Sequence, residues 1–124
     1  MRTAAQRAGD AAETRAAGHV TSLGWRVLGR QLRVGRAEID LLAIDPGPPP
    51  ALVVIEVRWR ARRDFGLAEE TVDGRKRARL HRAAFELRDA GRQPDGKPVP
   101  VLPLRFDLIV VEPGGRLRHH RYGA

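Results

Sequence analysis

Two apolar runs on either side of a proline-rich break place the strongest constraint on how this chain can fold. The runs Glu38 to Ile44 and Leu52 to Trp59 are rich in Ile, Leu and Val, and Asp45 to Pro50 between them reads D-P-G-P-P-P. Neither strand can continue through this break, so the chain must turn there. Consecutive strands joined by a short turn are normally antiparallel neighbours, and the sequence therefore predicts a hairpin.

Charged residues interrupt both apolar runs. Asp40 lies within A-E-I-D-L-L-A-I, and Glu56 and Arg58 lie within L-V-V-I-E-V-R-W. A charge inside a strand costs free energy unless it is paired, solvated or bound to a metal. If the hairpin is symmetrical about Pro48, Asp40 faces Glu56, with Cβ atoms about 5 Å apart. In the same register Glu38 faces Arg58.

The facing carboxylates allow two interpretations. Two carboxylates this close repel each other unless a cation lies between them. Carboxylate oxygens, completed by water and phosphate, suit Mg²⁺ or Mn²⁺, and such an ion can activate water for attack on a phosphodiester. The alternative is a plain cross-strand salt-bridge ladder of Glu56 and Arg58 with Glu38, in which Arg58 supplies the positive charge. The local pattern leaves both open.

The rest of the chain predicts helices packed on a mixed β-sheet. A long helix between the third and fourth strands fits a right-handed crossover, which makes those two strands parallel. We expect the order α-β-β-β-α-β-β within a single α/β domain spanning residues 1–124. Besides the hairpin, the expected elements are a helix over Thr3–Leu23, a strand over Trp25–Leu32, a helix over Leu67–Ala90, and strands over Leu102–Glu112 and Arg116–His120.

The charge balance indicates the class of partner. Lys and Arg together number 23 against 15 Asp and Glu, a net charge of +8, which favours contact with nucleic acid. Cysteine is absent, which excludes disulfides, thiolate metal ligands and a thiol nucleophile. No apolar run approaches the roughly 18 residues of a membrane span, and the first residues lack a signal-peptide core. We therefore expect a cytoplasmic protein with no membrane partner.

Seven short motifs follow one another along the chain in an order that is specific in combination. They are E-x3-A at 13–17, L-G-W at 23–25, E-I-D-L at 38–41, E-V-R at 56–58, F-G at 65–66, K-x3-L at 76–80 and R-F-D at 105–107. Together they resemble the YraN-like family of uncharacterised proteins. The resemblance implies a restriction-endonuclease-like fold with a variant of the PD-(D/E)xK nuclease signature. In that signature an Asp and a Glu hold the metal and a Lys assists the attacking water.

The resemblance also implies roles for single residues. Asp40 and Glu56 would be metal ligands. The backbone carbonyl of Val57 would be a further ligand, and Glu13 on the first helix would reach the same cleft or be an exposed helix charge. Arg58 stands where the motif has lysine. A guanidinium stays charged and cannot act as a base, although it can hold a phosphate or stabilise developing charge.

Other basic residues are candidates for phosphate contact. Lys76 lies on the apolar stripe of the second helix, where a lysine either reaches the surface along its stem or points into the cleft toward phosphate. Arg60, Arg62 and Arg63 follow the acidic strand and would flank a bound backbone, unless they are only a solvated strand end.

Three residues in the C-terminal part of the chain are expected to lie outside the candidate site. We expect Asp107 to pair with Arg105 or to cap the sheet, rather than to bind metal. The neighbouring His119 and His120 are expected at the surface.

Three functions from different classes are compatible with these features. The first is an endonuclease dependent on Mg²⁺ or Mn²⁺, with DNA favoured over RNA as its substrate. The second is a catalytically inactive nuclease-fold module that binds DNA or RNA through its basic surface, which Arg58 favours. The third is an interaction protein whose basic surface serves a protein or RNA partner.

Overall fold

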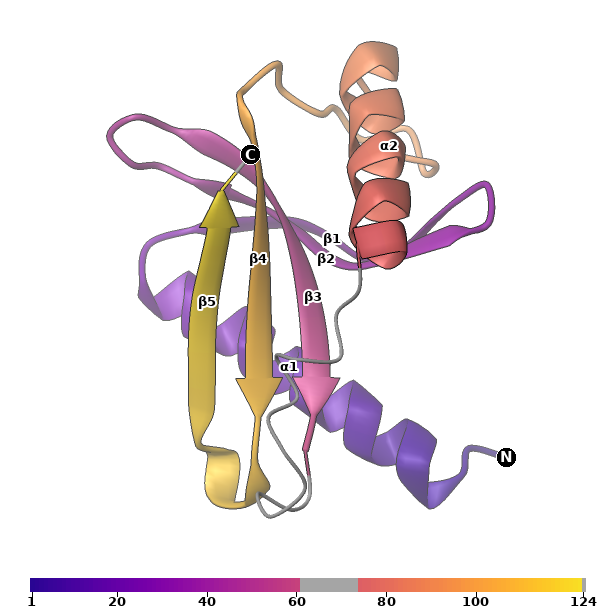
Figure 1. Cartoon of the computed structure of the whole chain (residues 1–124), viewed down its shortest axis with the longest axis vertical. Coiled ribbons are helices and arrows are strands. Elements are labelled where there is room, and N and C mark those ends of the chain that lie inside the picture. Colours follow the sequence, from indigo (N-terminus) through magenta and orange to yellow (C-terminus); the bar gives the residue numbers. More distant parts are fainter. Residues whose placement is uncertain (61–73, 124) are drawn as a thin grey trace.

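A five-stranded mixed sheet with one helix packed against each face forms the protein (Figure 1). The computed structural model describes residues 1–60 and 74–123. The predicted order of helices and strands is confirmed, and the predicted residues 67–73 of the second helix lie outside the described residues. The elements are α1 (Ala4–Ser22), β1 (Arg26–Val34), β2 (Ala37–Asp45), β3 (Ala51–Trp59), α2 (Gly74–Ala90), β4 (Leu104–Val111), a 3-10 turn η2 (Pro113–Gly115) and β5 (Leu117–Gly123).

The strands follow one another across the sheet in chain order, β1-β2-β3-β4-β5. β3 and β4 are parallel, as the crossover through α2 predicts, and the other neighbouring strands are antiparallel. Between β2 and β3 the register runs from Asp45 opposite Ala51 to Leu41 opposite Ile55. The predicted symmetry of this hairpin about Pro48 is therefore confirmed over these pairs.

Each face of the sheet carries its own hydrophobic core. Toward α1, the small residues Ala12 and Ala16 pack on alternate side chains of β2, β3 and β4 such as Ile55. Toward α2, Leu80 and Leu87 pack on the intervening side chains. β3 and β4 are covered on both sides, which explains why their sequences are almost continuously apolar.

A recognisable signal marks each end of α1. The Thr3 side chain accepts a hydrogen bond from Gln6 N–H, and the Gln6 side chain accepts one from Thr3 N–H, which together form a capping box. Gly24, with φ +87°, follows the helix and turns the chain toward β1.

Within residues 1–60 and 74–123, no helix has the length and apolar character needed to cross a membrane.

A buried network of charges joins β2, β4 and β5. Asp107 is fully buried and accepts hydrogen bonds from Arg105 Nε and Nη2 at 2.8 and 3.0 Å, which confirms their predicted pairing. Arg105 Nη1 also donates to Asp45 Oδ2 at 2.7 Å. His119 Nε2 lies 2.8 Å from Asp107 Oδ2, and the side chain is only 12% exposed. The predicted surface position of His119 is wrong because its ring completes this network.

Candidate active site

Asp40 and Glu56 converge where the regular pairing of β2 with β3 ends. Both side chains lie on the α2 face, each two residues along its strand from a core residue of that face, Leu42 or Val54. Glu56 is 4% exposed and Asp40 is half-buried. Asp40 Oδ2 accepts a hydrogen bond from Val57 N–H at 2.9 Å, and the two carboxyl groups interact directly. The hairpin thus presents two acids to one side of the sheet.

The environment of Asp40 disfavours its charged form. Burial is the largest cause, and the neighbouring charge of Glu56 adds to it, while the hydrogen bond from Val57 N–H opposes both. Together these effects raise the pKa of Asp40 to about 8. Near neutral pH the pair of acids therefore holds a proton, or needs a cation to take its place.

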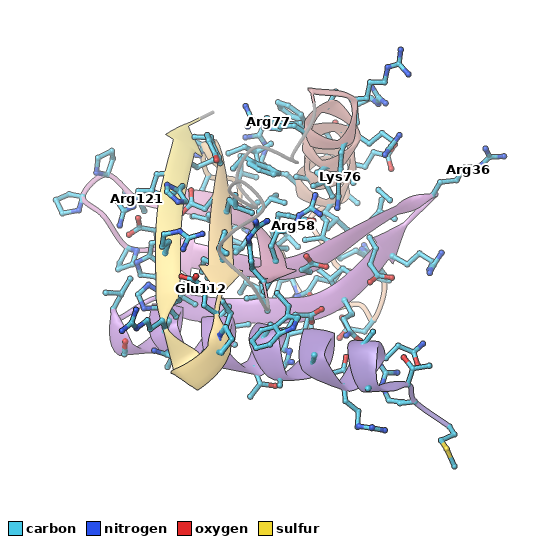
Figure 2. All side chains as sticks on the ribbon, turned by 60° about the horizontal axis from the view of Figure 1, so that its bottom comes forward. Arg36, Arg58, Lys76, Arg77, Glu112 and Arg121 are labelled. Atoms are coloured by element: carbon cyan, nitrogen blue, oxygen red, sulfur yellow. The ribbon has the colours of Figure 1, made fainter. Side chains whose placement is uncertain are left out.

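Two cationic side chains contact Glu56, the second acid of the pair. Lys76, in the first turn of α2, donates a hydrogen bond from Nζ to Glu56 Oε1, and Arg58 Nε lies 3.5 Å from the same oxygen. Figure 2 shows Lys76 and Arg58 reaching toward the same region from α2 and β3. The contact with Glu56 favours the interpretation in which Lys76 points into the cleft.

The alternative ladder of cross-strand ion pairs does not form as predicted. Glu38 pairs instead with Arg33 on β1, at 3.4 Å between Arg33 Nη2 and Glu38 Oε2. The reason lies in the sheet, because the pairing of β2 with β3 ends at Leu41, whereas the pairing of β2 with β1 continues to Ala37. Arg58 contacts Glu56 on its own strand, two residues away on the same face.

A pocket of about 230 Å³ opens over the two acids. It has room for an ion with several waters, since a water molecule takes about 30 Å³ in the liquid. Among residues 1–60 and 74–123, no three His, Cys, Asp or Glu side chains are arranged to hold a metal. Mg²⁺ commonly uses one or two carboxylates and takes its other ligands from water and phosphate. The pair Asp40 and Glu56 therefore fits such an ion.

Glu13 lies on the α1 side and still contributes to the electrostatics of this site. Its charge is among the effects that raise the pKa of Asp40, and burial raises the pKa of Glu13 itself. Gln31 Nε2 lies 3.4 Å from Glu13 Oε2, whereas Oε1 is buried without a hydrogen-bond donor among the described residues. The predicted roles of Glu13 and of the Val57 carbonyl as metal ligands stay predictions.

The predicted phosphate contacts fall partly outside the described residues. Arg60 is half-buried at the end of β3, where its backbone N–H donates to Val111 O at 2.9 Å. Arg62 and Arg63 lie within 61–73, which the structure does not describe. Sequence reasoning missed Arg36 and Arg79, both of which line the acidic pocket. The signals that could have found them are the turn at Gly35 and the three-residue spacing from Lys76 on α2.

The fold and site define a class of protein: a mixed α/β domain with a pair of strand carboxylates flanked by cations. The chain belongs to the uncharacterised protein family UPF0102, whose model matches residues 12–111. This confirms the YraN-like resemblance at the level of the family. The matched region contains Asp40, Glu56 and Lys76.

Relatives in several bacteria match over most of their length. A UPF0102 protein of Symbiobacterium thermophilum is 40% identical over 116 residues, which cover 91% of this chain and 90% of the relative. A UPF0102 protein of Deinococcus radiodurans is 41% identical over 106 residues, with 84% and 79% covered. A third, from Moorella thermoacetica, is 40% identical over 107 residues, with 86% and 81% covered.

Proposed function

We propose that this protein is a metal-dependent nuclease of restriction-endonuclease-like fold that hydrolyses phosphodiester bonds in DNA. The observation that carries the proposal is the convergence of Asp40 and Glu56 in a pocket that Lys76 also lines. Two adjacent carboxyl groups are suited to a hard dication. The parallel pair β3–β4, connected through α2, agrees with the proposed fold.

Asp40 and Glu56 would hold Mg²⁺ or Mn²⁺, with the Val57 carbonyl and Glu13 as candidate further ligands. When bound, the ion supplies a water of lowered pKa and stabilises negative charge on the phosphate. Glu56 would exchange part of its contact with Lys76 and Arg58 for the ion. These two side chains are then available to a phosphate oxygen.

Lys76 takes the role that the family motif gives to a lysine on the strand. Its ammonium already contacts Glu56, so it lies beside the position of the reacting phosphate and can stabilise charge or orient the attacking water. Arg58 acts as a fixed positive charge beside Glu56, because its guanidinium cannot accept a proton. Arg60, Arg62 and Arg63 would contact the backbone beyond the site.

A cleavage assay tests the proposal directly. Purified protein is incubated with single-stranded, duplex and branched DNA and with RNA, in Mg²⁺, in Mn²⁺ or in EDTA. We expect cleavage of DNA only when a cation is present. If neither the wild type nor Arg58→Lys cleaves any of these substrates, the nuclease proposal is wrong.

Lys76→Met is expected to lower the cleavage rate by about 10²-fold or more, the usual effect of removing one preorganised charged donor. Substrate binding in EDTA should change by only a few-fold, since one phosphate contact is lost. Lys97→Met is the matched control, because Lys97 is exposed and pairs with Asp95 in the loop after α2. Equal rates for the two variants would contradict the role given to Lys76.

A second candidate function has an observation in its favour. Glu56 already has two cationic partners, Lys76 and Arg58, which can neutralise it without a metal. A binding module that has lost the chemistry would therefore also be stable. It predicts affinity for nucleic acid that falls steeply with salt and does not respond to chelator.

A further inference from the structure

A second pocket adjoins the candidate active site, between α2 and the turn that joins β1 to β2. Its volume is about 280 Å³, and it shares Arg36, Ala37 and Arg79 with the pocket over the acids. The two pockets thus lie side by side and share part of their lining, and we call the pair the hairpin–helix groove. Its outer half is lined by Val34, Gly35, Arg36, Ala37, Arg79, Arg82, Ala83 and Glu86.

The groove is strongly basic along its outer half. Arg36, Arg79 and Arg82 are all exposed, and none of the three forms an ion pair with the residues that the structure describes. Glu86 is the one acid among the residues lining this half. Guanidinium groups stay charged at any working pH, so three positive charges face a single negative one. Such a surface is complementary to a polyanion.

The walls of the groove are built to present these arginines. Arg79 and Arg82 lie three residues apart on α2 and therefore on one side of the helix. On the opposite wall, Gly35 adopts φ +60° at the tip of the hairpin, and Arg36 follows it. Figure 2 shows Arg36 extending from this tip into solvent. Both walls thus carry guanidinium groups at the mouth of the groove.

The remaining lining residues are unsuited to reading bases. The uncharged ones are Gly35, Ala37, Ala83 and Val34, and the lining of this outer half contains no aromatic side chain. Recognition of single-stranded bases depends on stacking against aromatic rings. Guanidinium groups instead bind phosphate oxygens through paired hydrogen bonds. The chemistry of the groove therefore fits the sugar-phosphate backbone.

We propose that the hairpin–helix groove binds the phosphate backbone of the nucleic-acid strand that runs to the acidic pair, without base-specific contacts. This inference rests on the proposed function, because it places the strand relative to Asp40 and Glu56. Arg36 holds the strand from the hairpin side, and Arg79 and Arg82 hold it from α2. The inner end of the groove then delivers a phosphate to the carboxylates.

The test measures binding of a labelled single strand in EDTA, by fluorescence anisotropy, at several salt concentrations. Each single variant, Arg36→Ala, Arg79→Ala or Arg82→Ala, should bind several-fold more weakly than the wild type. The slope of log affinity against log salt should fall by about 0.7 for each lost contact, or about 2 for the triple variant. The affinity for a homopolymer and the affinity for a mixed sequence should fall by the same factor.

The matched control removes the same charge elsewhere. Arg26, Arg92 and Arg116 are exposed and lie outside the groove, so their triple alanine variant should keep most of the affinity and slope. If both triple variants lose affinity equally, only net charge matters and the proposed role of the groove is wrong. Unchanged thermal unfolding of both variants confirms that they are folded.

Cleavage separates failure of the groove from failure of the nuclease. If cleavage requires Asp40 but the groove triple variant binds and cleaves like the wild type, the groove is wrong and the nuclease proposal stands. If neither the wild type nor any variant cleaves, but only the groove triple variant loses binding, the groove stands and the nuclease proposal fails.

Discussion

Asp40→Asn is expected to make the protein more stable at pH 8 while removing its metal-dependent cleavage. The pKa of Asp40 is raised from 3.8 to about 8, first by burial and then by the charge of Glu56. Asparagine keeps the shape and the ability to accept from Val57 N–H, and its amide can donate to Glu56. The substitution therefore replaces repulsion by attraction, and it removes one of the two proposed metal ligands.

The stability gain should depend on pH in a defined direction. At pH values well below 3.8 Asp40 is protonated in both the folded and the unfolded chain, so wild type and variant should be equally stable. As pH rises to about 8 the unfolded chain loses the proton that the folded protein retains, and the wild type is progressively destabilised. The difference should grow by up to about 1.4 kcal/mol per pH unit and then level off.

Urea unfolding in EDTA between pH 4 and 9 measures this difference. Glu38→Gln is the matched control, because it removes an exposed acid that lines the same pocket and pairs with Arg33. Adding Mg²⁺ should stabilise the wild type, since an ion that binds only the folded state raises its stability, and should leave Asp40→Asn unchanged. If the wild type is more stable than the variant at pH 8 in EDTA, the raised pKa of Asp40 is contradicted. If Mg²⁺ stabilises both proteins equally, the role of Asp40 as a metal ligand is contradicted.

Asp107→Ala is expected to destabilise the protein by about 3–5 kcal/mol, the usual loss when one partner of a buried ion pair is removed. Asp107 is fully buried and accepts two hydrogen bonds from Arg105, whose side chain is only 16% exposed. Without the carboxylate, Arg105 keeps its charge but retains only Asp45 as an acidic partner within the described residues. His119 Nε2 loses its contact with Asp107 as well, and the ring keeps only the contact of Nδ1 with His19 among the hydrogen bonds of the described residues.

Chemical unfolding at neutral pH measures this loss. Asp10→Ala is the control, because Asp10 also pairs with an arginine, Arg2, at 2.6 Å, but both side chains are substantially exposed. An exposed pair contributes at most about 1 kcal/mol. Should the two variants lose similar stability, burial would not be what makes the Arg105–Asp107 pair important.

The hairpin shows why local sequence predicts some features well. Proline stops both strands at Asp45–Pro50, and the alternation of side chains then determines which residues share a face. A register shifted by one residue would turn Leu42 and Val54 away from α2 and expose them. The register, and with it the convergence of Asp40 and Glu56 on one face, followed from these local rules.

The partners of the charged residues were harder to predict. Glu38 pairs with Arg33 because β2 continues beside β1 beyond the point where its pairing with β3 ends. His119 is held inside by Asp107, although its own sequence neighbourhood is polar. Such contacts depend on strand lengths and on where the sheet pairing stops, which periodicity does not encode.

By itself the sequence determined the order of helices and strands, the hairpin symmetry and the two acids, since these depend on turn chemistry and on alternation along single strands. The tertiary structure decided that Lys76 reaches Glu56 and that Arg36 lies across a groove from Arg79 and Arg82. These residues are far apart in the chain, and only the packing of α2 on the sheet beside the β1–β2 turn brings their charges together.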